Sequence, residues 1–217
     1  MIWRAALVCL ACSGSAGAQE FLTAQSALSD DNFYRMVACA APPEGSCAKP
    51  MVRWPKSDLT IGITRMDAAY LGGKKKRAEA ALERALKQIN AAGSAIRLRR
   101  DDTAPDIPIL FLDMPARTTI RDSGFAALDG TPISAAGVRV FAKDGVIMTS
   151  VILFTTGLQM RAYESVMLEE IMQGLGFLTD IGGPYYESRS IFSQSSNALT
   201  KLGPQDIMVL GRHYPAR

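Results

Sequence analysis

Two adjacent glutamates, Glu169 and Glu170, precede a glutamine, Gln173, in a segment whose apolar spacing is that of a helix. Residues four apart stack on one face of a helix, so Glu169 and Gln173 point to the same side. Carboxylate and amide oxygens bind hard cations, and a positioned carboxylate can also act as a general acid or base. The pattern is that of a carboxylate site in which Glu170 is the candidate catalytic residue. The candidate binding residues are Glu169, Gln173 and Asp180, the last of which follows the helix.

The same two glutamates also have a purely structural interpretation. Adjacent helix positions differ by about 100°, so Glu169 and Glu170 cannot both face one point. In this interpretation one carboxylate reaches solvent and the other bonds to a neighbouring strand or loop. We favour it over the carboxylate site, because a helix can keep polar residues for packing after it has lost a ligand.

The elements that must position these residues follow from periodicity and from turn residues. The patterns predict strands at 59–64, 96–100 and 106–112, a long helix at 73–92, a strand hairpin around 143–145, a helix at 159–175 and a last helix that begins near Pro204. Pro108 indicates that the strand at 106–112 lies at a sheet edge or contains a bulge. This order is typical of an α+β domain with a mixed sheet and a long backing helix.

The first eighteen residues are typical of a signal peptide. Arg4 is followed by a short apolar run and then by the small residues Ala16, Gly17 and Ala18, as signal peptidase requires. We therefore expect export to the periplasm or the medium. An alternative is that Cys12 becomes a lipid-modified N-terminus. The remaining chain is divided into an N-terminal segment at 19–52, with a helix capped by Ser29 or Asp30, and a main domain at 53–217.

Charge excludes some classes of partner. The chain has 24 Lys and Arg against 21 Asp and Glu, and Arg4 lies in the predicted signal peptide, which leaves a net charge near +2 (23 − 21). This charge is too small to indicate nucleic-acid binding. The dense basic run at 74–77 opens a helical pattern and is interpreted as a solvated helix end. No transmembrane span is expected in the mature chain.

Cys39 and Cys47 are the two cysteines that remain after export. They lie eight residues apart in a segment rich in Pro and Gly, which favours a disulfide that closes a small loop and contributes ~2–3 kcal/mol. A zinc-ligand pair and a redox pair are the alternatives, and both lack the C-x-x-C spacing.

The segment EEIMQGLGF, Glu169 to Phe177, resembles the HExxHxLGF helix of the matrixin-type zinc peptidases. In that motif two histidines four apart bind zinc, and the glutamate after the first histidine activates the zinc-bound water. Here Glu169 and Gln173 stand at the histidine positions, and Glu170 keeps the general-base position. A glutamine amide is a poor replacement for imidazole. The resemblance therefore implies a degenerate metal-site helix.

The third ligand position of that motif is changed as well. Gly176 stands where the chain must turn, but the position ten residues after Glu169 is Thr179, with Asp180 beside it. His213, the single histidine, lies in the last helix, where we expect it to be partly buried or to cap the helix. No metal and no cofactor are expected.

Two later segments extend the resemblance. The letters SIF at 190–192 stand where matrixins have a Ser-Ile-Met turn under the zinc, and LGPQDIMVLGRHYP at 202–215 is similar to their final helix. The chain resembles still more closely the domain-of-unknown-function 2927 family of exported proteobacterial proteins, whose members carry EELxQxLGL and SIF segments. That resemblance covers about residues 53–215.

The resemblance implies a zincin-like half-domain without peptidase activity. It would serve as a binding or structural module of the cell envelope with an unidentified protein or envelope partner. One alternative is a hydrolase that uses Glu169 and Glu170 with a non-zinc cation or with no metal. The other is a lipid-anchored envelope assembly factor, which depends on Cys12.

Overall fold

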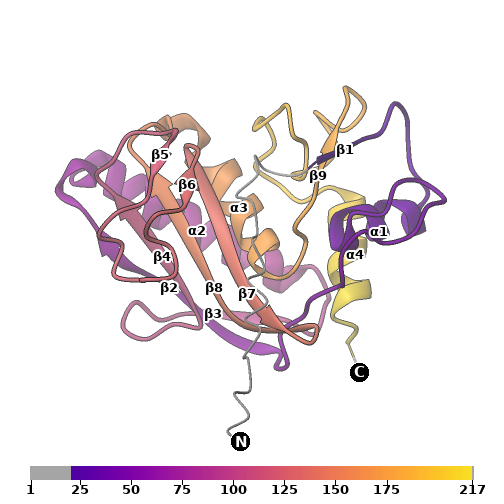
Figure 1. Ribbon diagram of the computed structural model, residues 1–217, viewed down its shortest axis with the longest axis horizontal. Helices are drawn as coiled ribbons and strands as arrows, with labels where there is room; N and C mark the ends of the chain where they lie inside the picture. The colour runs from indigo at the N-terminus through magenta and orange to yellow at the C-terminus, as the bar shows by residue number, and fades with distance from the viewer. Residues whose placement is uncertain (1–20, 217) are drawn as a thin grey trace, which may run out of the picture.

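The computed structural model describes residues 21–216, so the predicted signal peptide at 1–18 and the lipid-anchor candidate Cys12 lie outside the described residues. Within that range the elements are β1 (Phe21–Thr23), α1 (Asp30–Cys39), β2 (Asp58–Met66), α2 (Gly73–Ala91), β3 (Arg97–Arg100), β4 (Ile107–Leu112), β5 (Thr118–Thr119), β6 (Pro132–Ile133), β7 (Ala136–Lys143), β8 (Val146–Thr155), α3 (Tyr163–Gly174), β9 (Asp180–Gly182) and α4 (Pro204–His213). Single 3-10 turns occupy Ala68–Tyr70 and Met160–Ala162. Figure 1 shows their arrangement.

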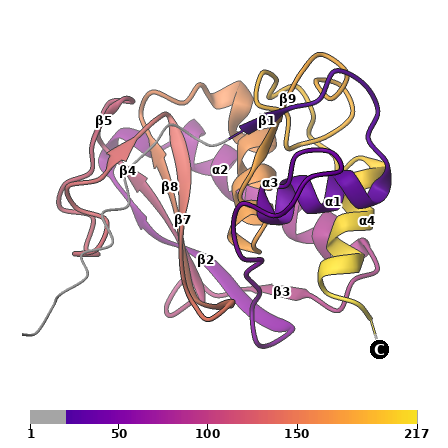
Figure 2. The ribbon, with the colours of Figure 1, turned by 45° about the vertical axis from the view of Figure 1, so that its right-hand side comes forward.

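A mixed sheet of five strands organises the molecule. Its order is β3-β2-β4-β8-β7, in which β7 at one edge is antiparallel to β8 and the other pairs are parallel. Helices α2 and α3 cover one face, and the segment that carries β5 covers the other (Figure 2). The predicted α+β class, the mixed sheet and the long backing helix are thus confirmed.

Two strand predictions have different outcomes. The hairpin around 143–145 is confirmed, because Asp144 and Gly145 join β7 to β8 and both have positive φ, as a two-residue turn of this kind requires. The sequence predicts an edge or a bulge at Pro108. The edge is wrong, since β4 lies between β2 and β8, but the pairing of β2 with β4 does have an irregular register, which shifts between Ile63 and Arg65 of β2. Proline is tolerated there because Pro108 pairs only with Gly62 of β2, and the pairing with β8 begins one residue later.

The segment before the sheet packs into the main core. Ser29 caps α1 by accepting a hydrogen bond from the Asn32 amide at 3.2 Å. Phe33 and Met36 of α1 are buried in the same core as the sheet, and α1 lies beside α4 (Figure 1). The strand β1 was not predicted from the sequence, and it pairs in parallel with β9. Among the helices of residues 21–216, none combines the length and the apolar character needed to cross a membrane.

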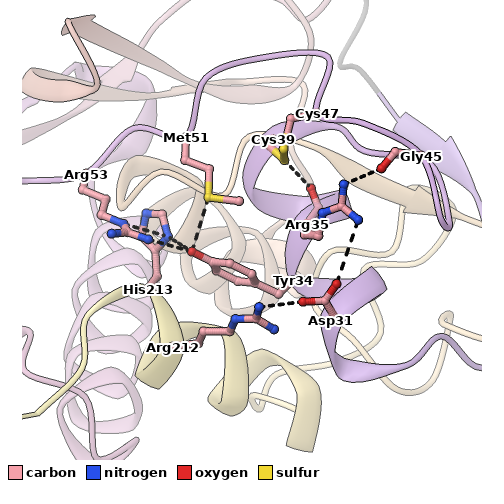
Figure 3. Close-up of a disulfide and its surroundings, with 10 residues drawn as sticks. All are labelled: Asp31, Tyr34, Arg35, Cys39, Gly45, Cys47, Met51, Arg53, Arg212 and His213. Carbon is pink, nitrogen blue, oxygen red and sulfur yellow. Dashed lines mark hydrogen bonds and ion pairs between the residues drawn. A yellow bond between two sulfur atoms is a disulfide. The ribbon is translucent and has the colours of Figure 1, made fainter.

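The predicted disulfide between Cys39 and Cys47 is confirmed (Figure 3). It joins the last residue of α1 to the loop that follows. The amides of Ala48 and Lys49 donate to the Cys39 carbonyl at 3.0 and 3.1 Å, and the Arg35 guanidinium donates to the Gly45 carbonyl. The loop is therefore held by several contacts besides the covalent bond.

We expect a double variant, Cys39→Ser with Cys47→Ser, to lower the free energy of unfolding by ~2–3 kcal/mol, because the unfolded chain gains the entropy that the closed loop removes. Urea unfolding followed by tryptophan fluorescence would measure this change. A reducing agent should destabilise the wild type by a similar amount and leave the double variant unchanged. Equal midpoints for the oxidised wild type and the variant would contradict a stabilising bridge.

Candidate functional site

Helix α3 carries the candidate site, and it is buried along almost its whole length. It contacts α2, the edge strand β7 and the neighbouring strand β8. Glu169, Glu170 and Gln173 are only 7%, 3% and 5% exposed. The burial of both glutamates contradicts the structural interpretation, in which one of them reaches solvent. Both are buried because other elements cover α3 on several sides.

Gln173 and Asp180, two of the candidate binding residues, contact each other directly. The Gln173 side chain donates from Nε2 to Oδ1 of Asp180 at 2.8 Å, and Asp180 is 1% exposed. Asp180 is the first residue of β9, which pairs in parallel with β1. The amide of the preceding residue, Thr179, donates to the Val37 carbonyl of α1. The N-terminal segment therefore helps to fix Asp180 against α3.

Glu170 is the electrostatically unusual member of the set. Its Oε2 atom is buried and has no hydrogen-bond partner within residues 21–216. Burial raises the pKa of Glu170, the charge of Asp180 raises it further, and Arg139 of β7 opposes both effects. Burial also raises the pKa of Asp180, against the hydrogen bond from Gln173. Burial thus disfavours the ionised form of both acids, and Glu170 and Asp180 titrate as an interacting pair.

Three hydroxyl groups on segments next to α3 or β9 are also buried and lack partners in the described part of the chain: Ser150 Oγ, Thr179 Oγ1 and Ser193 Oγ. A Cβ added at Gly174 would lie 2.9 Å from the Ser150 hydroxyl, so this face of α3 contacts β8 without space for a larger residue. Ser150 and Arg139 could not be recognised from the sequence, because strand residues carry no local signal of what faces them from a distant helix.

Zinc does not fit the residues of this site. The donors on α3 and β9 are the carboxyl groups of Glu169, Glu170 and Asp180 and the neutral amide of Gln173, with no imidazole or thiolate among them. Burial disfavours the ionised form of Glu170 and Asp180, and zinc prefers thiolate, imidazole or ionised carboxylate. Within residues 21–216 no three His, Cys, Asp or Glu side chains gather in a way that could hold a metal ion.

His213 has a different role, at the junction of α4 with the N-terminal segment (Figure 3). Its Nε2–H donates to the Val52 carbonyl at 2.9 Å, so its Nδ1 can accept from the Tyr34 hydroxyl at 3.0 Å. Arg53 donates from Nη2 to the same hydroxyl at 2.9 Å. Burial lowers the pKa of His213 to about 4. The imidazole is therefore buried and neutral, and both its nitrogens are bonded within the fold.

The segments that carry the matrixin resemblance lie together in space. Phe192 of the SIF turn is fully buried and packs against Phe177, with ring centroids 5.8 Å apart. Asp206 of α4 accepts hydrogen bonds from the Ser190 hydroxyl at 2.6 Å and from the amides of Ile191 and Gly203 at 3.1 and 2.7 Å. The turn and the last helix are thus joined through one buried carboxyl group. Comparison of the chain with protein-family models and with curated proteins finds no match.

Proposed function

We propose that this chain is an exported cell-envelope protein whose zincin-like domain has lost peptidase chemistry and acts as a binding or structural module. The observation that carries the proposal is the state of the former ligand positions. Glu169 and Gln173 are buried, Gln173 bonds to Asp180, and the acid beside them is raised in pKa by burial. A buried acid that retains its proton is a poor general base.

The zincin-like assignment is supported by the order and contacts of the elements. A long helix, α2, backs the mixed sheet, an antiparallel edge strand lies beside α3, and the SIF turn and α4 follow. Gly176 turns the chain after α3 with a φ of 111°. A Cβ at this position would lie 2.2 Å from the Val52 carbonyl oxygen, so glycine is required.

The burial of Glu170, which is 3% exposed, also favours a module without catalysis. A base must approach its substrate within hydrogen-bond distance.

A hydrolase that uses Glu170 with a non-zinc cation or with no metal is the second candidate function. It is favoured by the raised pKa values of Glu170 and Asp180, because acids with shifted pKa values are common in active sites. The third candidate, a lipid-anchored envelope assembly factor, depends on Cys12. A mass measurement of the mature N-terminus distinguishes a chain that starts at Gln19 from a lipid-modified one.

The main test combines metal content with complementation. We expect the mature protein, incubated with zinc and dialysed, to keep no stoichiometric metal. Glu170→Gln should complement a deletion strain as fully as the wild type, because a module without catalysis needs no ionised Glu170. Glu164→Gln is the matched control, since Glu164 lies on the same helix and pairs with Arg84 at the surface. Stoichiometric zinc that Glu169→Ala abolishes would overturn the proposal, and so would loss of complementation by Glu170→Gln alone at a normal protein level.

A further inference from the structure

A pocket of about 510 Å³ lies away from the α3 acids, between the segment before α1, the loop after β9 and the start of α4. This volume is within the range of about 300–1,000 Å³ that is typical of small-molecule sites. Its lining residues are Ala27, Leu28, Tyr185, Ser188, Arg189, Leu199, Lys201, Leu202, Gly203, Pro204 and Gln205.

The charged residues that line the pocket are all positive. Arg189 and Lys201 contribute two positive charges, and no Asp or Glu is among the lining residues. Neither cation has a carboxylate partner in the described part of the chain. An anion that enters the pocket therefore meets two cations that form no ion pair with a carboxylate of residues 21–216.

Arg189 is already oriented toward such an anion. Its guanidinium carbon lies 4.3 Å from the centroid of the Tyr185 ring, and Nη1 donates to the Tyr185 carbonyl at 2.9 Å. Stacking and one hydrogen bond restrict the side chain and leave its other N–H groups for a ligand. Less side-chain entropy is lost on binding as a result.

The rest of the lining is mainly apolar. Leu28, Leu199 and Leu202 are half-buried and pack against the main core while also facing the pocket. Pro204 and the Tyr185 ring extend this surface. A ligand that joins a negative group to an apolar body fits this pocket, because the two cations can bind the negative group and the apolar side chains can contact the body.

Hydrogen bonds between distant segments keep the walls in place. Gln205 accepts from the Tyr186 hydroxyl at 3.1 Å and donates to the Leu28 carbonyl at 3.1 Å. Gln88 of α2 donates to the Thr200 carbonyl at 2.8 Å and accepts from the Leu202 amide at 3.1 Å. Three carboxyl groups lie on the segments around the pocket without lining it: Asp30 accepts from Gln205, Asp206 is buried, and Glu187 is exposed beside Ser188.

We propose that this pocket binds a small organic anion in which a carboxylate is joined to an aromatic or aliphatic body. Arg189 and Lys201 bind the carboxylate, and the leucine wall with Tyr185 binds the body. The proposal does not rest on the lost peptidase chemistry, since the pocket shares no lining residue with the α3 site.

The test uses 2-naphthylacetate as the probe and its neutral amide, 2-naphthylacetamide, as the matched ligand. In titrations of the mature protein followed by two-dimensional amide NMR, we expect saturable shifts in residues 27–28, 185–189 and 199–205. The amide ligand should bind about tenfold more weakly, because a hydrogen bond to a charged group contributes roughly that factor.

Two variants test whether Arg189 and Lys201 bind the carboxylate of the probe. Arg189→Gln and Lys201→Gln should each weaken 2-naphthylacetate binding by about tenfold and bring its affinity toward that of the amide ligand. Both residues are exposed, so the fold should be kept. Lys143→Gln, at an exposed cation on the β7–β8 hairpin, is the control and should bind normally. Equal binding of acid and amide, shifts outside the pocket, or no saturable shift at millimolar probe would each overturn the proposal.

Discussion

Replacing Glu170 with glutamine is expected to stabilise the protein at pH 8 much more than at pH 5. Burial and the neighbouring Asp180 raise the pKa of Glu170 to about 8 in the folded protein. In the unfolded chain a glutamate has a pKa of about 4.3. Between these two values the folded state binds more protons than the unfolded state, so stability falls as pH rises through this window. Glutamine has no proton to lose and escapes this penalty.

The expected difference is large because Glu170 is almost fully buried. Each pKa unit corresponds to about 1.4 kcal/mol, so the penalty in the wild type at pH 8 is on the order of 2 kcal/mol or more. Urea unfolding of the wild type and of Glu170→Gln at pH 5, 6, 7 and 8 measures it. The informative quantity is how the difference in free energy of unfolding between the two proteins changes with pH. The buried glutamine amide also affects stability, but its effect does not depend on pH.

Titrating groups that do not interact with Glu170 cancel in that difference, whereas the contribution of Asp180 is part of it, because the two acids interact. His213, with a lowered pKa of about 4, makes the folded protein more stable as pH rises toward 6.5, and Asp206, with a raised pKa of about 6, has the opposite effect. Both groups are present in the wild type and in the variant. Glu164→Gln, at the surface of the same helix, should give a difference that does not change with pH. The same flat difference for Glu170→Gln would show that Glu170 is ionised in the folded protein, which would restore it as a candidate base.

The sequence predicted the elements whose signals are local. The three- and four-residue spacing of α2, the turn at Asp144 and Gly145 and the Pro204 start of α4 each depend on a few neighbouring residues. Cys39 and Cys47 belong to this group, because a bridge across eight residues needs no knowledge of the fold.

The features that sequence reasoning missed depend on distant segments. The strand β1 has three residues and forms by pairing with β9, far away in the chain. The burial of both Glu169 and Glu170 follows from the cover that α2 and β7 provide, which a helical pattern alone does not show. The sequence predicts only that Gln173 and Asp180 share a site. The hydrogen bond between the Gln173 amide and the Asp180 carboxylate depends on the path of the chain after Gly176, which the sequence pattern does not show.

Asp206→Ala is expected to lower the free energy of unfolding by about 3–5 kcal/mol, because it removes a fully buried carboxyl group that accepts three hydrogen bonds. The Ser190 hydroxyl and the amides of Ile191 and Gly203 would be left without acceptors, and each unsatisfied buried group costs about 1–3 kcal/mol. Urea unfolding at pH 7 measures the loss.

Two further variants separate this network from a general effect of removing a carboxylate. Asp206→Asn should recover most of the stability, since its one oxygen can accept from both amides while its NH₂ group donates to the Ser190 hydroxyl. Asp31→Ala breaks an exposed ion pair with Arg212 and should cost under about 1 kcal/mol. If Asp206→Ala costs no more than Asp31→Ala, the network does not hold the turn to α4. Asp206 joins the SIF segment directly to the start of α4. A large loss of stability in Asp206→Ala would therefore explain, without a metal, why these two segments occur together.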